Sequence, residues 1–356
     1  MWCELRVRGT GAFVGLRVLG AILSLLSAAT FALNITAARR GVVTGTPIQG
    51  TALTIPIGVA CFLAATVAME QIAHVDAFPP AAAGWMAAVG LLHFLLGRYC
   101  NYRANQAAGV NITAPVIQLQ IVVTLALAVI VLQEPCSILQ IVGAVVMLAG
   151  ALLTQYQRPG SAVASGSAAP ERIPATAGMH RSKAVFVARY APGYLFASLA
   201  ALAYGTSPIM ARFALESTGP GGGVLGGLVA YTAATAVVGL AMIWPPLRRE
   251  VAAVKRENIR WFAYSGVFVA LAQGFFFAAV AVAPIMLVSP LLQFSLLFRL
   301  LFSKLFNPDH EIFGRIVVAG VAISIVGSLI VSADTDTILR LVPTPQWLAA
   351  ALRWRL

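Results

Sequence analysis

Charged residues are scarce in this sequence. Only 10% of its 356 residues are Asp, Glu, Lys or Arg, whereas 60% are hydrophobic, and the mean hydropathy is +0.87. A water-soluble domain of this composition would expose large apolar patches. The chain instead supplies repeated apolar runs of about 20 residues, the length that crosses a bilayer as a helix. No strand pattern of alternating polarity competes with these runs, so we expect an all-α membrane protein.

Motifs for metal binding and catalysis are also missing. The four cysteines, Cys3, Cys61, Cys100 and Cys136, form no CxxC pair and have no nearby histidine, which argues against zinc and leaves free thiols as the expectation. The apolar runs contain no Ser/His pair, paired carboxylates or metal ligands, which an intramembrane enzyme would need. We therefore expect no enzyme activity, no cofactor and no metal.

Acidic residues are absent from the middle of every apolar run. A proton-coupled pump for hydrophobic cations needs a carboxylate inside the membrane, so the sequence argues against that class. The net charge of +12 comes from connections rather than from an amphipathic face, which argues against a nucleic-acid partner. The expected partners are a small-molecule solute and membrane lipids, and the chain is expected to be a monomer or a homodimer.

Ten apolar runs are predicted to be transmembrane helices. They cover residues 15–36, 46–69, 83–105, 109–132, 138–156, 191–213, 222–244, 260–282, 285–305 and 313–332. Residues 157–190 are rich in Gly, Ser, Ala and Pro, which is typical of a flexible linker. In the tail, residues 333–356, Trp and Leu alternate with Arg, which suits either a short helix in the membrane interface or a disordered segment.

The two halves, residues 1–156 and 191–332, repeat in sequence. Matching residues recur in one order at offsets of 173, 175 and 177. They are Arg39 with Arg212, Pro115 and Gln118 with Pro290 and Gln293, and Glu134, Gly143 and Gly150 with Glu311, Gly320 and Gly327. Five spans per copy is an odd number, so we expect two inverted five-helix repeats. Such proteins place a solute site near the midplane and expose it alternately to each side.

Four sequence stretches carry a family resemblance: "ALNITAARRG", "GTSPIMARFAL", "HFLLGRYCNYRANQAAGVNITAPV" and "QEPCSILQIVGAVVMLAG". In this order they resemble the EamA-type ten-span permeases of the drug/metabolite transporter (DMT) superfamily, over about residues 15–332. The resemblance implies transport, usually export of amino acids or other metabolites, by a multi-pass protein of a bacterial inner (plasma) membrane. It does not fix the substrate.

Polar residues cluster in the third run, where His93, Gly97 and Asn101 recur every four residues beside Arg98. An arginine at the bilayer centre costs roughly 2.5 to 3.5 kcal/mol, so it needs a cavity, a partner or a ligand. Snorkelling to the headgroups is the alternative, and it is favoured for Arg103. A structural role for the lone His93 is also open. We take His93, Arg98 and Asn101 as candidate solute-binding residues.

The ninth run supplies a second cation, Arg299, after Pro290 and Gln293. Two buried guanidiniums from opposite repeats would suit a carboxylate or phosphate, unless Arg299 snorkels to the interface. Pro115 and Pro290 can break their helices, with Gln118 and Gln293 one turn later to bind solute or to join helices.

Asn34 in the first run and Ser207 in the sixth complete the candidate solute-binding set, with packing as the alternative role. The function predicted from all these residues is a permease or exporter of a small anionic or zwitterionic metabolite, such as an amino acid or organic acid. The alternatives are an exchanger of phosphorylated metabolites and a membrane-embedded scaffold or lipid-handling protein.

The orientation in the membrane stays open. When Arg98, Arg103 and Arg299 are left out, 14 of the remaining Lys and Arg lie in or beside odd-numbered connections, and seven lie in or beside the termini and even-numbered connections. By the positive-inside rule the termini should face outside, whereas the resembled family usually has both termini inside.

Overall fold

The computed structural model describes residues 10–42, 45–108, 113, 116–153, 189–216, 218, 221–306, 315–333, 335–341 and 345–354. The first half contains α1 (Thr10–Val42), α2 (Pro47–Ala68), α3 (Pro80–Val89), η2 (Gly90–Gly97), α4 (Arg98–Ala108), α6 (Gln120–Ile130) and α7 (Ile138–Leu153). The second half contains α8 (Tyr190–Glu216), α9 (Gly222–Ala241), α10 (Pro245–Ala252), α11 (Arg256–Val282), α12 (Ile285–Leu291), η4 (Leu292–Phe294), α13 (Ser295–Phe306) and α14 (Arg315–Ser332).

The helices coincide with the ten predicted spans. Six are long and apolar enough to cross a membrane on their own, and four shorter apolar helices cover residues 116–130, 138–153, 285–299 and 316–332. Local sequence explains the start of α2. The Thr46 side chain accepts from the Gln49 backbone N–H, the Gln49 side chain accepts from the Thr46 backbone N–H, and Pro47 occupies the first turn. The predicted all-α, ten-span architecture is confirmed.

The contacts at the end of α11 show that the repeats are inverted. Gly20, near the start of α1, lies against Ala283 just after α11. Arg212, near the end of α8, donates to the carbonyls of Val280 and Ala283 at that same end. α1 and α8 are equivalent helices at an offset of 173. Because the start of α1 and the end of α8 lie at the same end of α11, the two helices run in opposite directions.

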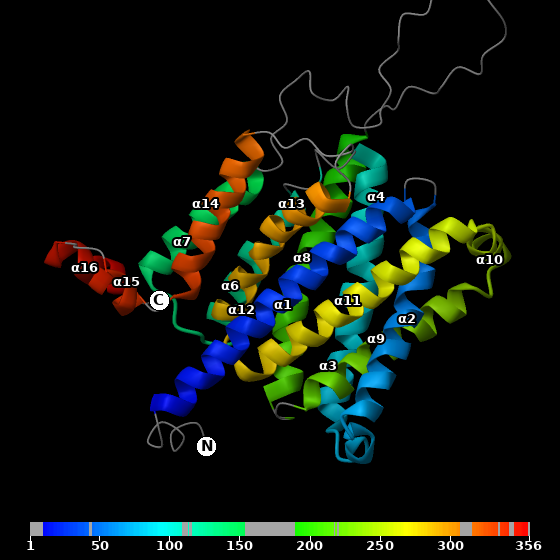
Figure 1. Cartoon of the computed structure of the whole chain (residues 1–356), viewed down its shortest axis with the longest axis horizontal. Coiled ribbons are helices and arrows are strands. Elements are labelled where there is room, and N and C mark those ends of the chain that lie inside the picture. The colour runs from blue at the N-terminus through cyan, green and yellow to red at the C-terminus, as the bar shows by residue number, and fades with distance from the viewer. Residues whose placement is uncertain are drawn as a thin grey trace, which may run out of the picture.

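Each repeat's first span packs on the other repeat's third span. α1 lies along α11, and α8 lies against α3, η2 and α4 (Figure 1). The two interfaces use equivalent small residues, since Gly193 lies against Ala108 as Gly20 lies against Ala283. The halves therefore interlock through four helices rather than meeting at one flat surface.

Glycines let α7 and α14 approach closely, and the two helices lie side by side in Figure 1. A Cβ at Gly143 would be 2.7 Å from the Ile330 side chain, and one at Gly327 would be 2.6 Å from the Gly143 carbonyl oxygen. A Cβ at Gly150 would likewise be 2.7 Å from the Gly320 carbonyl oxygen. Close approach through small residues is the usual basis of helix packing in lipid.

The third and ninth spans are not continuous α-helices. η2 is a π-helical segment between α3 and α4. After Pro290 the ninth span passes through the tight turn η4 before α13 begins, and Ser328 of α14 donates to the Pro290 carbonyl at 2.6 Å. The Pro290 carbonyl thus has a polar partner from another span. Pro290 lies inside α12, and its role as a broken-helix solute site stays a prediction. Pro115 lies outside the described residues.

The tail contains two short helices, α15 (Thr335–Leu341) and α16 (Gln346–Arg353). Trp347 and Trp354 are exposed, and the Ile138 backbone N–H donates to the Trp354 carbonyl at 3.1 Å. The tail is thereby attached to the start of α7. Its location in the membrane interface stays a prediction. The flexibility of the linker also stays a prediction, because residues 157–188 lie outside the described part of the chain.

Candidate functional site

His93 lies at the centre of the bundle, in the π-helical segment η2. Its Nδ1 is 2.7 Å from the Ser207 hydroxyl of α8, and its Nε2 is 3.5 Å from the Gln273 amide of α11. The Tyr204 ring packs against the imidazole, with centroids 4.8 Å apart. His93 is therefore held by three side chains of the second repeat. Sequence analysis selected His93 and Ser207, and the structure brings them together. The expectation that the apolar runs contain no Ser/His pair is therefore wrong, because a pair formed between two different spans does not show in the sequence of either one.

Asn34 makes the pseudo-symmetric counterpart of this contact. The Ser265 hydroxyl of α11 donates to Asn34 Oδ1 at 2.6 Å. Asn34 and Ser207 are equivalent at the offset of 173, and each binds the third span of the other repeat. These two predicted residues thus join the halves, and a role in solute binding stays a prediction for both.

Arg98 begins α4 and is half-buried. Its guanidinium donates to the Thr54 hydroxyl of α2 at 2.9 Å, and Thr54 in turn donates to the Gly50 carbonyl at 2.7 Å. Within the described part of the chain, no Asp or Glu forms an ion pair with Arg98. A cation inside a bundle of apolar helices, fixed by a neutral hydroxyl, is suited to receive an anion.

The other predicted residues do not form one described cluster with Arg98. They are Asn101, half-buried on α4; Gln118, half-buried in the helical turn 116–118; Gln293, buried in η4; and Arg299, half-buried on α13. α13 packs on α1, whereas α4 packs on α8. A clamp formed by Arg98 and Arg299 therefore stays a prediction.

We call His93, Arg98 and the side chains around them, Thr54, Ser207, Tyr231 and Gln273, the central cluster. Three of these residues were missed by the sequence analysis: Thr54, Tyr231 and Gln273. Tyr231 is fully buried, and its ring stacks on Phe94 with centroids 4.2 Å apart. Each of the three is a polar side chain inside an apolar run. The same signal selected residues in the first, third, sixth and ninth spans, but none in the second, seventh and eighth.

A pair of opposite charges holds the turn between α11 and α12. Both carboxylate oxygens of Glu134 accept backbone N–H groups at the start of α12, from Ile285 and Met286, at 2.8 Å each. Arg212 binds the carbonyls at the end of α11. An anion at a helix start and a cation at a helix end both match the helix dipoles. Glu134 belongs to the first repeat and α12 to the second, so this contact also joins the halves.

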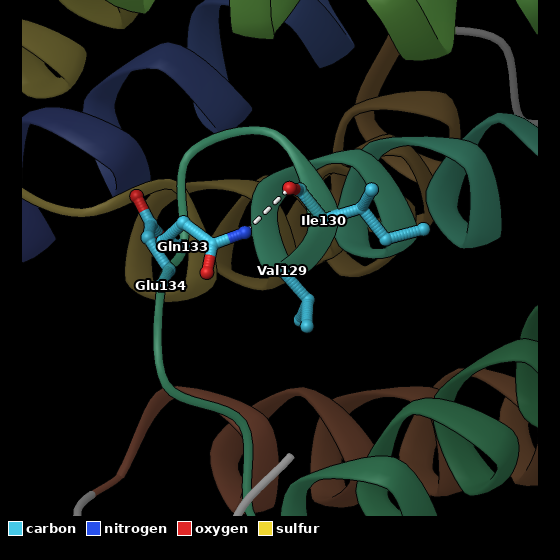
Figure 2. A pocket seen from close by; sticks show the side chains of 4 residues that line it. All are labelled: Val129, Ile130, Gln133 and Glu134. Carbon is cyan, nitrogen blue, oxygen red and sulfur yellow. Dashed lines mark hydrogen bonds between the residues drawn. The ribbon is translucent and has the colours of Figure 1, made fainter.

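Two cavities border Glu134. One, of about 340 Å³, is lined by Val129, Ile130, Gln133 and Glu134, and Figure 2 shows Gln133 donating to the Ile130 carbonyl beside it. The other, of about 190 Å³, is lined by Arg17, Glu134 and residues of the turn and the α14 end. Both lie at the end of the bundle where α11 stops, and neither is lined by His93 or Arg98.

Glu134 gives a prediction for pH dependence. Burial raises the pKa of Glu134, although the N–H groups of Met286 and Ile285 and the charge of Arg212 oppose this. The folded protein therefore holds this proton to a higher pH than the unfolded chain does. The resulting stabilisation is full below the unfolded-state pKa and is lost as pH rises through the folded-state pKa.

We expect the difference in melting temperature, wild type minus Glu134→Gln, to decrease as pH rises from about 4 to about 8. The same measurement on Glu70→Gln, which changes an exposed glutamate, is the control and should show no comparable trend. A constant difference between wild type and Glu134→Gln would contradict the prediction.

Comparisons with known proteins agree with this architecture. The model of the EamA-like transporter family matches residues 18–156 and 191–333, one match for each repeat. A solved structure described only as "Crystal structure of protein" is 19% identical, with a TM-score of 0.63, over 93% of this chain and 99% of that chain. This likeness concerns the fold alone. No curated protein matches the chain.

Proposed function

The chain belongs to the EamA-like transporter family, and from this premise we propose that it is a permease, and not an enzyme, for a small anionic or zwitterionic metabolite such as an amino acid or organic acid. Membership establishes a multi-pass membrane transporter of the DMT type. The solute class and the location in a bacterial inner membrane are parts of the proposal.

The observation that carries the solute class is Arg98. Its guanidinium lies in the third span, bound to Thr54, and no described acid neutralises it. Removing a charge from water costs desolvation free energy, and an opposite charge beside it offsets part of that cost. An anionic group on the transported solute would supply that charge whenever the site is loaded.

Alternating access is supported by the way the halves interlock. The contacts of His93 with Ser207 and of Asn34 with Ser265 each join a first span to the opposite third span. Because these two contacts are pseudo-symmetric, the bundle has two equivalent seams that can open in turn. We propose that solute enters through one seam and leaves through the other.

Flux measurements test the proposal. Purified protein in liposomes is given radiolabelled L-amino acids, pyruvate, malate and glucose 6-phosphate in separate experiments. We expect saturable uptake of at least one amino or organic acid above that of protein-free liposomes. Uptake of glucose 6-phosphate alone would indicate an exchanger of phosphorylated metabolites. Lipid transfer between leaflets without solute flux would reject the permease.

A further inference from the structure

The Tyr231 hydroxyl is a buried polar group without a hydrogen-bond partner in the described part of the chain. Tyr231 is 0% exposed and lies near the middle of α9. Leaving a buried hydroxyl unpaired costs about 1 to 3 kcal/mol, and native proteins rarely tolerate it. A partner that the described part of the polypeptide does not provide is therefore expected at this position.

The surroundings of Tyr231 fix where its ring lies. It lies against Gly58 of α2, where any Cβ would overlap the ring, and it stacks between Phe62 and Phe94 with centroids 5.3 and 4.2 Å away. Gly58 is one turn beyond Thr54, the residue that binds Arg98. Phe94 precedes Arg98 by about one turn in the third span. The phenol thus belongs to the same neighbourhood as the guanidinium.

Arg98 and Tyr231 both contact α2, Arg98 at Thr54 and the Tyr231 ring at Gly58 one turn later. The two donors come from different repeats, since Arg98 is in the third span and Tyr231 is in the seventh. Neither has an acidic partner among the described residues. An anion placed between them would satisfy both groups at once.

We propose that the Tyr231 hydroxyl and the Arg98 guanidinium together bind the carboxylate of the transported solute, one donor group from each repeat. This inference rests on the proposed function and narrows it to carboxylates. Thr54 positions Arg98 and does not contact the solute, because its hydroxyl is already used, donating to Gly50 and accepting from Arg98.

The number of donors favours a carboxylate over a phosphate. A carboxylate has two oxygens, which a guanidinium fork and one hydroxyl satisfy. A phosphate monoester presents three oxygens and close to two charges, and it would require further cations. The described neighbourhood supplies one arginine. His93 does not add an available donor, because both ring nitrogens face Ser207 and Gln273.

A solute bound to one group from each repeat also links binding to movement. Tyr231 is inaccessible in this conformation, so the halves must part before a solute reaches its hydroxyl. A carboxylate that contacts both repeats stabilises the conformations in which the two donors face each other. Binding energy is then available to draw the halves together around the solute.

Tyr231→Phe tests the inference because it removes only the hydroxyl. The probe is the amino or organic acid from the flux experiment with the highest uptake, and the readout is its Kd by isothermal titration. We expect Tyr231→Phe to raise the Kd about 10-fold or more, as for a lost hydrogen bond to a charged group. The melting temperature of the ligand-free protein should not fall, since the lost hydroxyl has no partner among the residues that the structure describes.

Thr235→Val is the matched control. Thr235 lies one turn further along α9, and its hydroxyl is also buried without a described partner, so the variant removes a comparable group. It should leave the Kd unchanged. A second readout uses 3-fluorotyrosine: the fluorine NMR signal that disappears in Tyr231→Phe should shift when the acid is added.

The outcomes separate the inference from the proposed function. If wild type binds an acid and Arg98→Ala weakens binding while Tyr231→Phe does not, the role of Tyr231 is wrong and the permease stands. Equal weakening by Tyr231→Phe and Thr235→Val would also overturn it, since a general effect on α9 would then be responsible. If wild type transports no carboxylate, both proposals fall.

Discussion

Replacing Arg98 by alanine is expected to raise the Kd for a transported carboxylate at least 30-fold. The guanidinium is the only cation of the described central cluster, and it is held in place by Thr54. Removing one member of a desolvated charge pair costs about 2 to 5 kcal/mol, which corresponds to roughly 30-fold to several thousand-fold in affinity. The measurement is the Kd by titration, with uptake into liposomes as the functional counterpart.

Arg103→Ala is the matched control for this prediction. It removes the same charge from the same helix, but Arg103 is exposed and its guanidinium lies over the Phe196 ring, 5.9 Å from the centroid. We expect the Kd to change less than about 3-fold, because the Arg103 guanidinium lies over the Phe196 ring and not beside Thr54, the residue that holds Arg98. If both variants weakened binding equally, the effect would reflect overall charge and Arg98 would lose its place in the site.

The fold was predictable from the sequence because the physics that determines it is local and repetitive. Each span is an apolar run of membrane-crossing length, and the odd number of runs per repeat requires inversion. Gly143 and Gly150, which match Gly320 and Gly327 in the repeat, lie where α7 and α14 pack closely. The π-helical segment η2 was not predicted, since no proline or charge in residues 90–97 indicates it.

The site was only partly predictable, because sequence spacing places residues on a face of one helix but does not say which other helix they meet. His93 and Ser207 were selected separately, and their contact depends on α8 packing against η2. Tyr231 was missed, since one tyrosine in an apolar run is most often a packing residue. Its unpaired hydroxyl is visible only when every neighbouring helix is in place.

The close approach of α3 and η2 to α9 determines whether this cluster exists at all. At Gly90 a Cβ would lie 2.7 Å from the carbonyl carbon of Ala230 and closer still to its oxygen. These are backbone atoms of a helix, so they cannot rotate away as a side chain would. Ala230 directly precedes Tyr231, and Gly90 is one turn before His93. A longer distance between Gly90 and the Ala230 backbone therefore moves the two repeats apart at the centre of the bundle.

Gly90→Ala is accordingly expected to destabilise the protein by about 3 kcal/mol, at the upper end for overpacking, and to abolish carboxylate transport. Gly84→Ala is the control, since it makes the same change earlier in the same span, where a Cβ would meet no atom within 4 Å. Melting temperature and uptake are measured on both variants. If Gly90→Ala kept wild-type stability and transport, the two helices could not be as close as described, and the packing that brings Tyr231 against Phe94 would be in error.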